Sequence, residues 1–337
     1  MTKIDVKDRK ILSELDMDAR MPITKLAKKV GLSRQVVEYR IKRMQKENII
    51  HGTKGIFDSV VAGFNWYRVV LRLLHVTKEE KEDFLTFLKT HKNTLWLGEV
   101  GGNWDLVVNF VCKDHFAFNK IFEEIVSLYG RYIHDSEVLI YVDVHDYERS
   151  YILKKKELTI KKGERKEFFH QMIFNPLIKI DKLSQKLIGT LAQNSLPSNL
   201  EVGKKLNVTG NTITNRIKQM QKEKLLLGFR LFINPSVLGY QSHMLLLETT
   251  RLDLGVEKKL NAYLKSIPQV IFVVKHIGKW RIGIEIETKN QQEFQDIFVD
   301  LRGKFSEIIT NFESFPIFKD YAINYFPEGV LNKKIKK

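Results

Sequence analysis

The chain has 337 residues, a length that suggests two or more domains. Hydrophobic residues make up 43% of it and charged residues 28%, a globular composition that excludes wholesale disorder. The 56 Lys and Arg residues exceed the 40 Asp and Glu residues and give a formal net charge of +16. Such an excess favours a polyanionic partner, either nucleic acid or an acidic membrane surface.

Cysteine usage and hydropathy indicate the compartment. Cys112 is the one cysteine, so an internal disulfide is excluded and a reducing environment is expected. The first ten residues are charged and lack the apolar core of a signal peptide. No segment approaches the roughly 18 apolar residues that a membrane span needs. We therefore expect a soluble, cytoplasmic protein with no membrane partner.

The sequence repeats itself. Residues 40–47 (RIKRMQKE) match residues 216–223 (RIKQMQKE) at seven of eight positions, an offset of 216 − 40 = 176. The same offset, without a gap, also aligns glycines and a tryptophan: Gly52 with Gly228, Gly63 with Gly239, Gly102 with Gly278, and Trp104 with Trp280. We interpret this register as an internal duplication, each copy holding a helical unit and then a mixed unit.

The first unit of each copy has the pattern of a helix-turn-helix. Apolar spacing predicts helices over 5–16, 23–30 and 34–48. Gly31 can adopt the positive φ of the turn between the last two helices, and Ser33 is a good N-cap for the third.

The second copy repeats this plan with weaker residues. Gly203 stands where Ala27 does, which keeps a close helix crossing. Asn207 replaces the turn glycine and tolerates positive φ, and Thr209 is the cap.

The third helix of each unit is the candidate DNA reader. In the first copy its outward face offers amide and guanidinium groups for base edges near its start and cations for phosphates farther along. A basic surface helix without DNA contact is the alternative, and Arg40 could instead brace the helix through a carboxylate. The second face is more neutral, so the two modules should read different bases. The candidate residues are Ser33, Arg34, Gln35, Glu38, Tyr39, Arg40, Lys42, Arg43, Thr209, Gly210, Asn211, Thr214, Asn215, Arg216 and Lys218.

The second unit of each copy predicts a compact α+β domain. In the first copy we expect strands at 66–76, 94–100, 104–112 and 133–142, and helices at 78–91 and 114–129. This βαββαβ order is the ferredoxin-like arrangement, in which both helices cover one face of the sheet. The other face needs burial elsewhere, and two such domains in one chain can bury these faces against each other.

These predictions give an α+β fold: two copies of a winged or three-helix helix-turn-helix unit, each followed by a ferredoxin-like βαββαβ domain. We expect helix-turn-helix domains at 1–55 and 179–231, ferredoxin-like domains at 62–150 and 238–328, a basic linker at 151–178 and a basic tail at 329–337. The linker and the tail are interpreted as solvated segments, with a strap along the DNA backbone as the alternative.

At this point the chain resembles the Lrp/AsnC family of prokaryotic transcriptional regulators over nearly its whole length, twice. The resemblance rests on Leu32-Ser33, on 39–44 (YRIKRM) and on 49–52 (IIHG). It rests also on 102–105 (GNWD) before a strand, which is similar to the family's Gly-x-aromatic-Asp signature. It implies double-stranded DNA as the partner, a dimer-like body with two DNA-binding heads, further self-association, and response to a small molecule such as an amino acid.

The resemblance also implies where an effector would bind. The family's signature carries over to Gly102, Asn103, Trp104 and Asp105, and in the second copy to Gly278, Lys279, Trp280 and Arg281. Arginine stands there where aspartate is expected. Because a carboxylate suits an ammonium group and an arginine suits a carboxylate, the second copy has either lost this site or changed its ligand.

Two alternatives remain beside a regulator. Sirohaem decarboxylases resemble the same fold and hold tetrapyrrole carboxylates with His and Arg, but here the histidines are scattered without a shared motif: His75, His91, His115, His134, His145 and His276. A ligand-sensing or assembly protein that has lost DNA binding is the other alternative. Cys112 is interpreted as core, and neither a zinc spacing nor a phosphate-binding glycine loop occurs. We expect no enzyme activity, no catalytic residue, no metal and no cofactor.

Overall fold

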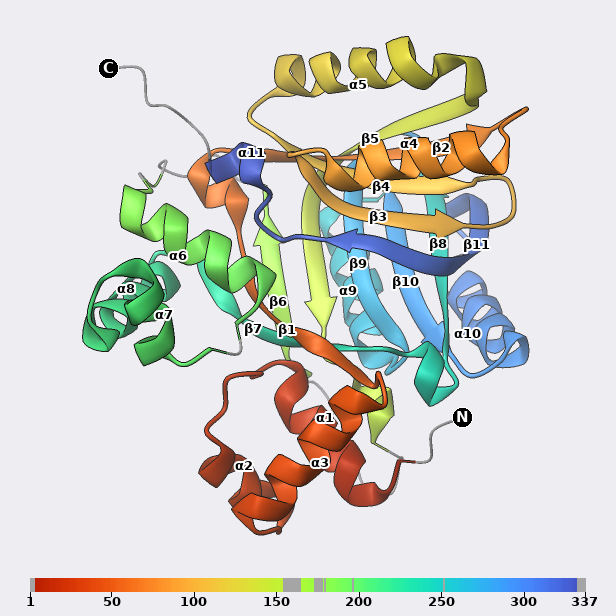
Figure 1. Ribbon diagram of the computed structural model, residues 1–337. Coiled ribbons are helices and arrows are strands. Elements are labelled where there is room, and N and C mark those ends of the chain that lie inside the picture. The colour runs from red at the N-terminus through yellow and green to blue at the C-terminus, as the bar shows by residue number, and fades with distance from the viewer. Residues whose placement is uncertain are drawn as a thin grey trace.

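The computed structural model describes residues 4–153, 165–172, 178, 180–195, 197–250 and 252–331 (Figure 1). One order of elements occurs twice. The first copy runs α1 (Val6–Asp16), α2 (Ile23–Val30), α3 (Arg34–Lys46), β1 (Ile50–Phe57), β2 (Asn65–Leu73), α4 (Lys78–Thr90), β3 (Thr94–Val100), β4 (Leu106–Cys112), α5 (His115–Tyr129) and β5 (Ile133–Tyr147). The second runs α6 (Lys182–Gln193), α7 (Asn199–Leu206), α8 (Gly210–Lys222), β7 (Leu226–Ile233), β8 (Gln241–Thr249), α9 (Leu254–Ser266), β9 (Val270–Ile277), β10 (Ile282–Thr288), α10 (Gln291–Lys304) and β11 (Ile309–Ile323). Strand β6 (Glu167–Gln171) lies between the copies, and α11 (Glu328–Leu331) follows the second.

The strands of the two mixed units form one antiparallel ring. Each copy contributes a ferredoxin-like sheet, β5-β2-β4-β3 in the first and β11-β8-β10-β9 in the second. The long closing strands join the sheets: residues 133–140 of β5 pair with β2 and 140–146 with β9, whereas 309–317 of β11 pair with β8 and 317–323 with β3. The fold is therefore α+β with the predicted ferredoxin-like order, and the two sheets meet within the chain.

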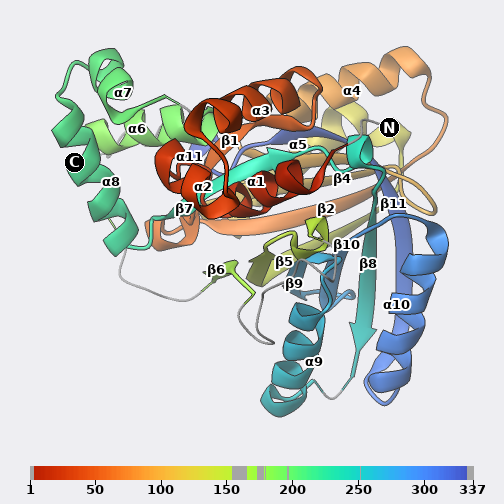
Figure 2. The ribbon, with the colours of Figure 1, turned by 90° about the horizontal axis from the view of Figure 1, so that it is seen from below.

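Each sheet has one face covered by helices and one turned toward the other sheet. Helices α4 and α5 cover the first sheet and α9 and α10 the second (Figures 1 and 2). Alternation along the strands places a second apolar set between the sheets. This shared cluster includes Val70, Val107, Leu246 and Phe315, which come from both copies. The bare sheet faces thus bury each other, as the sequence predicts.

The helix-turn-helix heads are attached crosswise. Strands β1 and β7 form a two-stranded antiparallel ribbon, from the pair Ile50–Ile233 to the pair Phe57–Leu226. Helix α1 contacts β7 and α6 contacts β1, so each head packs on the strand that follows the other head. The apolar core of the first head accordingly contains Leu231 and Ile233 from the second copy.

The structure corrects several predicted boundaries. The segment 151–178 contains β6, which pairs with β5, so part of the expected linker is a strand of the sheet. The remainder, 154–164 and 173–177, on which the strap alternative rests, lies outside the described residues, as does the tail from 332. The closing strand continues to Tyr147 because its second half pairs with the other copy. The third helix ends at Lys46 rather than 48, since Asn48 has a φ of 55°. Within the described ranges, none of the helices combines the length and hydropathy of a membrane span.

Candidate nucleic-acid interface

The turn between α2 and α3 has the geometry that its residues favour. Gly31 adopts a φ of 65° and ends α2, and the Ser33 hydroxyl accepts the Val36 N–H at 3.3 Å to cap α3. In the second head Asn207 takes the same left-handed conformation, with a φ of 58°. A Cβ at Gly203 would lie 2.7 Å from the Val208 carbonyl oxygen, so this close approach requires glycine.

Helix α3 turns one face to its own core and another to solvent. Val37 and Met44 are buried within the first head. The side chains on the open face that are exposed are Ser33, Arg34, Gln35, Tyr39 and Lys42, whereas Glu38, Arg40 and Arg43 are half-buried. The Arg34 Nε donates to Glu38 at 2.7 Å, an ion pair one helical turn apart.

The Arg40 and Arg43 side chains brace the head instead of facing outward. Arg40 Nη1 lies 2.7 Å from Asp5 and 2.8 Å from Asp8, and Arg43 Nη2 lies 2.6 Å from Asp8. Asp8 is buried, so α1 holds α3 through these ion pairs. The expectation that Arg40 contacts DNA is therefore not supported by its position, which matches the bracing alternative.

The second head retains one of these three ion pairs. Arg216 Nη1 lies 2.8 Å from Asp181, which are the residues equivalent to Arg40 and Asp5. This arginine too is engaged within the head instead of on its open face. Exposed on that face are Thr209, Asn211, Asn215 and Lys218, with Gly210 and Thr214 partly covered, which gives the more neutral surface that the sequence predicts.

The two candidate effector turns lie against the shared core. Trp104 and Trp280 are buried in the same cluster between the sheets, with exposed fractions of 5% and 2%. Each turn also contacts the closing strand of the other copy: Asn103 donates to Glu313 at 2.9 Å, and Lys279 lies 3.4 Å from Glu137. These contacts join the two copies.

The carboxylate of the first turn has a structural partner. Asp105 Oδ2 accepts the Leu73 N–H at 2.7 Å, at the end of β2. Gly102 has a φ of 76° and Gly278 a φ of 141°, which a side chain rarely adopts. Arg281 is exposed and the Lys279 ammonium lies 4.7 Å above the Trp280 ring. The signature residues thus shape the turns and the strand that follows.

Comparison with known proteins identifies the family. A model described as the AsnC-type helix-turn-helix domain matches residues 4–45. The proline dehydrogenase transcriptional activator of Rhodobacter capsulatus is 30% identical over 125 residues, which are 37% of this chain and 81% of that protein. The chain belongs to the Lrp/AsnC family of transcriptional regulators. The HTH-type transcriptional regulator FL11 of Pyrococcus horikoshii is a further relative, 25% identical over 126 residues, or 37% of this chain and 82% of FL11.

A solved structure shares the arrangement of this Lrp/AsnC chain over both copies. The siroheme decarboxylase NirDL aligns with a TM-score of 0.63 and covers 96% of each chain at 12% sequence identity. At this identity the likeness shows the fold alone. Homologues with a clear sequence match are named as regulators, and the decarboxylase likeness carries no activity to this chain.

A polar cluster between the two sheets of this Lrp/AsnC chain was not predicted from the sequence. Arg68 is buried, donates to Asn109 Oδ1 at 3.1 Å and to the Tyr141 hydroxyl at 2.6 Å, and forms no ion pair with a carboxylate among the described residues. His276 is buried beside it, and burial together with the Arg68 charge holds its pKa well below the usual value. The signal was present: these polar residues interrupt apolar strands at positions whose alternation points away from the helices.

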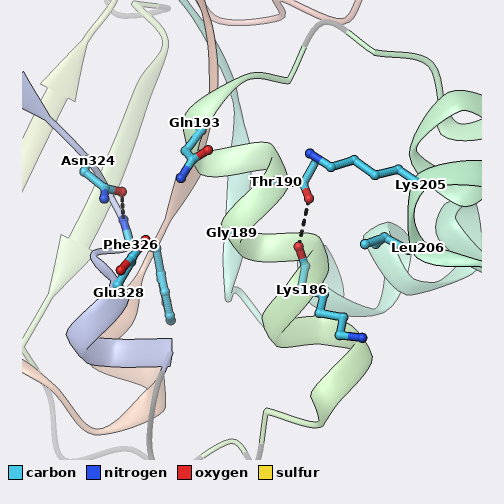
Figure 3. A pocket seen from close by; sticks show the side chains of 9 residues that line it. All are labelled: Lys186, Gly189, Thr190, Gln193, Lys205, Leu206, Asn324, Phe326 and Glu328. Carbon is cyan, nitrogen blue, oxygen red and sulfur yellow. Dashed lines mark hydrogen bonds between the residues drawn. The ribbon is translucent and has the colours of Figure 1, made fainter. Parts of the chain in front are cut away.

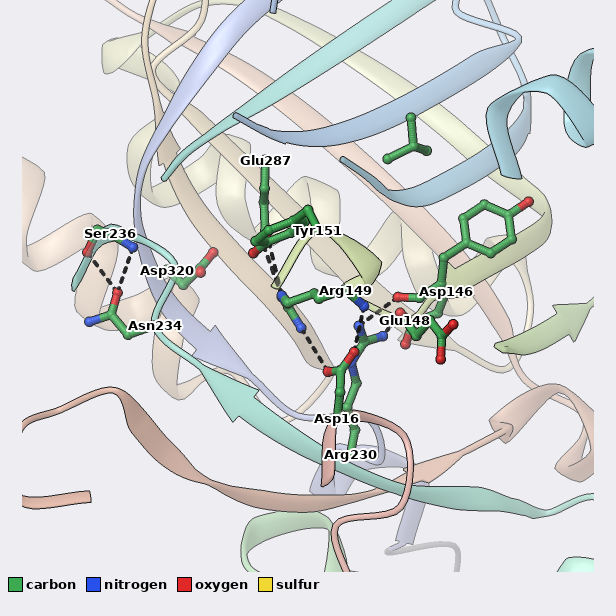
Figure 4. A network of polar contacts seen from close by, with 12 residues as sticks. Asp16, Asp146, Glu148, Arg149, Tyr151, Arg230, Asn234, Ser236, Glu287 and Asp320 are labelled. Atoms are coloured by element: carbon green, nitrogen blue, oxygen red, sulfur yellow. Dashed lines mark hydrogen bonds and ion pairs between the residues drawn. The ribbon is translucent and has the colours of Figure 1, made fainter. Parts of the chain in front are cut away.

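A second missed cluster attaches the first head to the body (Figure 4). The Asp16 carboxylate, at the end of α1, accepts the Arg149 N–H at 2.6 Å, and Arg149 Nη2 lies 3.0 Å from Glu287 on β10. Arg230 contacts Asp16 and Asp146, and Tyr151 donates to Glu287. Burial lowers the pKa of Arg149, but Glu287 and Asp16 raise it well above the usual range, so the buried guanidinium stays charged.

The equivalent positions under the second head carry no such network. Ala192 stands where Asp16 does, and Val111 where Glu287 does. Both lie in the apolar cluster that joins the second head to the body. The first head of this Lrp/AsnC chain is therefore attached by a buried ion network as well as by apolar contacts, whereas an apolar cluster occupies the equivalent place under the second.

Proposed function

We propose that the chain is a sequence-specific regulator that binds double-stranded DNA through two heads on a body formed by one polypeptide. The observation that carries the proposal is that α3 has two separate sets of polar side chains, one that holds the helix in place and one that faces solvent. Arg40 and Arg43 fix the helix on α1, while Arg34, Gln35 and Lys42 are exposed on its open face. A rigid helix with amide and guanidinium groups near its N-terminus suits the edges of bases in a major groove.

The two heads of the proposed regulator are not equivalent. Asn211 and Asn215 occupy the open face of α8 where Gln35 and Tyr39 occupy that of α3. Amide side chains favour adenine and arginine favours guanine, so the two heads should select different base pairs. We expect an asymmetric operator whose two parts are about one helical turn, roughly 34 Å, or a multiple of it apart.

Selection of binding sites from random duplexes tests this function. Arg34→Ala or Gln35→Ala should relax base preference in one part of the selected site, because a base-reading group is lost. Lys42→Ala should weaken all duplexes alike and reduce the slope of log affinity against log salt by about one, because one phosphate contact is lost. Lys89→Ala, an equal charge change on exposed α4 of the body, is the control and should change neither quantity.

The result that would overturn the proposal is a full-length protein that binds no duplex even at low salt. That result would favour the ligand-sensing alternative instead. An unchanged selection profile for Arg34→Ala would show that α3 does not read bases through this residue. The proposal assigns no effector to the 102–105 and 278–281 turns, because both tryptophans are buried and Asp105 accepts a main-chain N–H.

A further inference from the structure

The loop between α1 and α2 of the first head reaches residues of the second copy. The Ala19 N–H donates to the Phe229 carbonyl oxygen at 3.0 Å, and Ala19 packs against the apolar clusters of both heads. Arg20 follows, and its guanidinium lies 4.9 Å from the centre of the Phe229 ring on β7. Arg20 therefore points away from its own head and lies against the other copy.

Two oxygen atoms at the start of the second head accept from Arg20. Its Nη2 donates to the Pro197 carbonyl oxygen at 2.9 Å and to Asn199 Oδ1 at 2.8 Å. Asn199 is the first residue of α7. Burial lowers the pKa of Arg20, and no carboxylate forms an ion pair with it among the residues that the structure describes. The second head thus supplies the acceptors that compensate this partly buried charge.

Asn199 connects Arg20 to the candidate reading helix of the second head. Its Nδ2 donates to the Thr214 hydroxyl at 2.9 Å, and that hydroxyl donates to the Gly210 carbonyl oxygen at 2.9 Å. Every group in the series donates in the same direction, from the guanidinium to the first turn of α8, and such hydrogen bonds strengthen one another. The hydroxyl of Thr214, a candidate base reader, is therefore engaged within the protein.

The equivalent positions of the first head cannot form this link. At the 176-residue offset, Ile23 and Glu38 stand where Asn199 and Thr214 do. Because the isoleucine side chain has neither a donor nor an acceptor, no such series can reach α3 through that position. Glu38 pairs instead with Arg34. The link joins the first head to the reading helix of the second, without a counterpart in the other direction.

The other end of α7 borders open space. A groove of about 290 Å³ lies there between the second head and the body (Figure 3). Lys205 and Leu206, at the end of α7, line it together with Phe326 and Glu328 of the body. Such a groove leaves room for the second head to tilt relative to the body. Arg20 contacts the opposite end of the same helix, where it can oppose that motion.

We propose that Arg20 is a positioning residue that couples the two heads through Asn199 and Thr214 and so fixes the spacing at which both bind DNA. The inference rests on the proposed function and deepens it, because it assigns what sets the spacing of the operator. Two modules held in one relative position act at a high effective concentration on sites of matching separation and at a low one on others. Without the link, the second head should accept more spacings and bind the preferred one less tightly.

A distance measurement between the reading helices tests the link in the full-length protein without DNA. Spin labels are attached through Lys42→Cys and Lys218→Cys, equivalent exposed positions on α3 and α8, while buried Cys112 stays unlabelled. In the Arg20→Met background, pulsed electron paramagnetic resonance should give a distance distribution broader by about 1.5-fold or more. Arg20→Lys keeps a charged donor and should restore much of the original width. Lys28→Met removes an exposed charge from the same head and should leave the width unchanged.

The dependence of DNA binding on spacing tests the consequence. The unlabelled full-length protein is titrated with the selected operator and with the same operator lengthened by one base pair between its two parts. The insertion moves the second part by about 3.4 Å and rotates it by about 35°. We expect it to weaken wild-type binding by about tenfold or more and Arg20→Met binding by about threefold or less. A duplex with the first part alone should bind both proteins equally, because the reading face of the first head is unchanged.

An unchanged distance distribution in Arg20→Met would overturn the link. A broader distribution with an unchanged spacing penalty would overturn its role in DNA binding. Should Arg20→Met fold poorly, as judged by its thermal unfolding, Asn199→Leu decides by the same two measurements, because it removes both the acceptor and the donor at the centre of the link. The distance measurement contains no DNA, so a protein that binds no duplex would refute the proposed function while the link is decided separately.

Discussion

Glu285, on β10, carries its carboxylate among other charges at the inner face of the ring of strands. Burial raises the pKa of Glu285 to about 8, and the nearby carboxylates of Glu287 and Asp320 raise it further than Arg149 and Arg68 lower it. Asn109 occupies the equivalent position of the first copy. One copy therefore places a neutral amide where the other places an acid that burial keeps protonated near neutral pH.

This acid predicts a pH dependence of stability. The folded-state pKa lies above the ordinary value of 4.5, so the native state holds the proton that the unfolded state releases. The free energy of unfolding should fall as pH rises from about 4.5 towards 8, and this contribution should level off above it. Glu285→Gln should be more stable than the wild type at pH 8.5, by on the order of 2 kcal/mol, and similar to it near pH 5. Urea unfolding at the two pH values checks this, and a difference that does not change with pH would contradict the assignment.

At the scale of elements, the N-terminus of α1 sets the position of α3. The Asp8 carboxylate accepts from Arg40 and Arg43 and also from the Asp5 N–H at 3.0 Å, which completes a capping box. The second head has Ser184 and Gln219 where the first has Asp8 and Arg43. The two copies thus use different side chains, charged in the first and neutral in the second, at the same contact between the first and third helices.

Replacing the charged residues of the first head by their neutral counterparts from the second gives a prediction about the stability of the first head. Asp8→Ser should lower the free energy of unfolding by about 1–3 kcal/mol, because Arg43 keeps its partly buried charge without its closest partner. Arg43→Gln in the Asp8→Ser background should recover part of the loss, so the double-mutant cycle should show coupling of about 1 kcal/mol or more. Denaturant unfolding of the four proteins measures the cycle, with amide exchange in α3 as the local readout. Strictly additive losses would show that the ion pair does not hold the helix.

The sequence predicted the elements well where local signals are strong. The helix-turn-helix follows from apolar spacing, Gly31 and Ser33, and both βαββαβ units from alternating strands and turns. The burial of the two sheet faces against each other was predicted, but the pairing of individual distant strands was not. Strand β6 is only five residues long and follows a charged stretch, so its pairing with β5 has no local signal.

The candidate sites show the same limit. The open face of α3 was predictable from helical spacing alone. The engagement of Arg40 with Asp5 depends on how two helices pack, and the sequence left both roles open. The ion network of Asp16 depends on tertiary contacts, although the offset already pairs Ala192 with Asp16.

At the scale of the whole molecule, duplication within one chain removes a constraint that applies to a dimer of two identical subunits. In a symmetric dimer, a residue introduced at one seam appears at both. Here the cluster of Arg68, Tyr141 and His276 has Met244, Ile317 and Val100 at the equivalent positions, so the polar residues have no polar counterparts across the pseudo-symmetry. Heads with different surfaces and different attachments follow from the same freedom.

That argument requires the two sheets to meet within one polypeptide, which an engineered disulfide can test. Glu99 on β3 and Lys319 on β11 are partners in the seam between the copies. Cysteines at directly opposed antiparallel positions lie within the Cα separation that a disulfide needs. Glu99→Cys with Lys319→Cys should therefore oxidise within one chain and migrate as a monomer on a non-reducing gel. Native Cys112 should not compete, because burial raises the pKa of its thiol to about 12. Each single variant is the control and should form no intrachain bond. A covalent dimer of the double variant at low protein concentration would show that the sheets pair between chains.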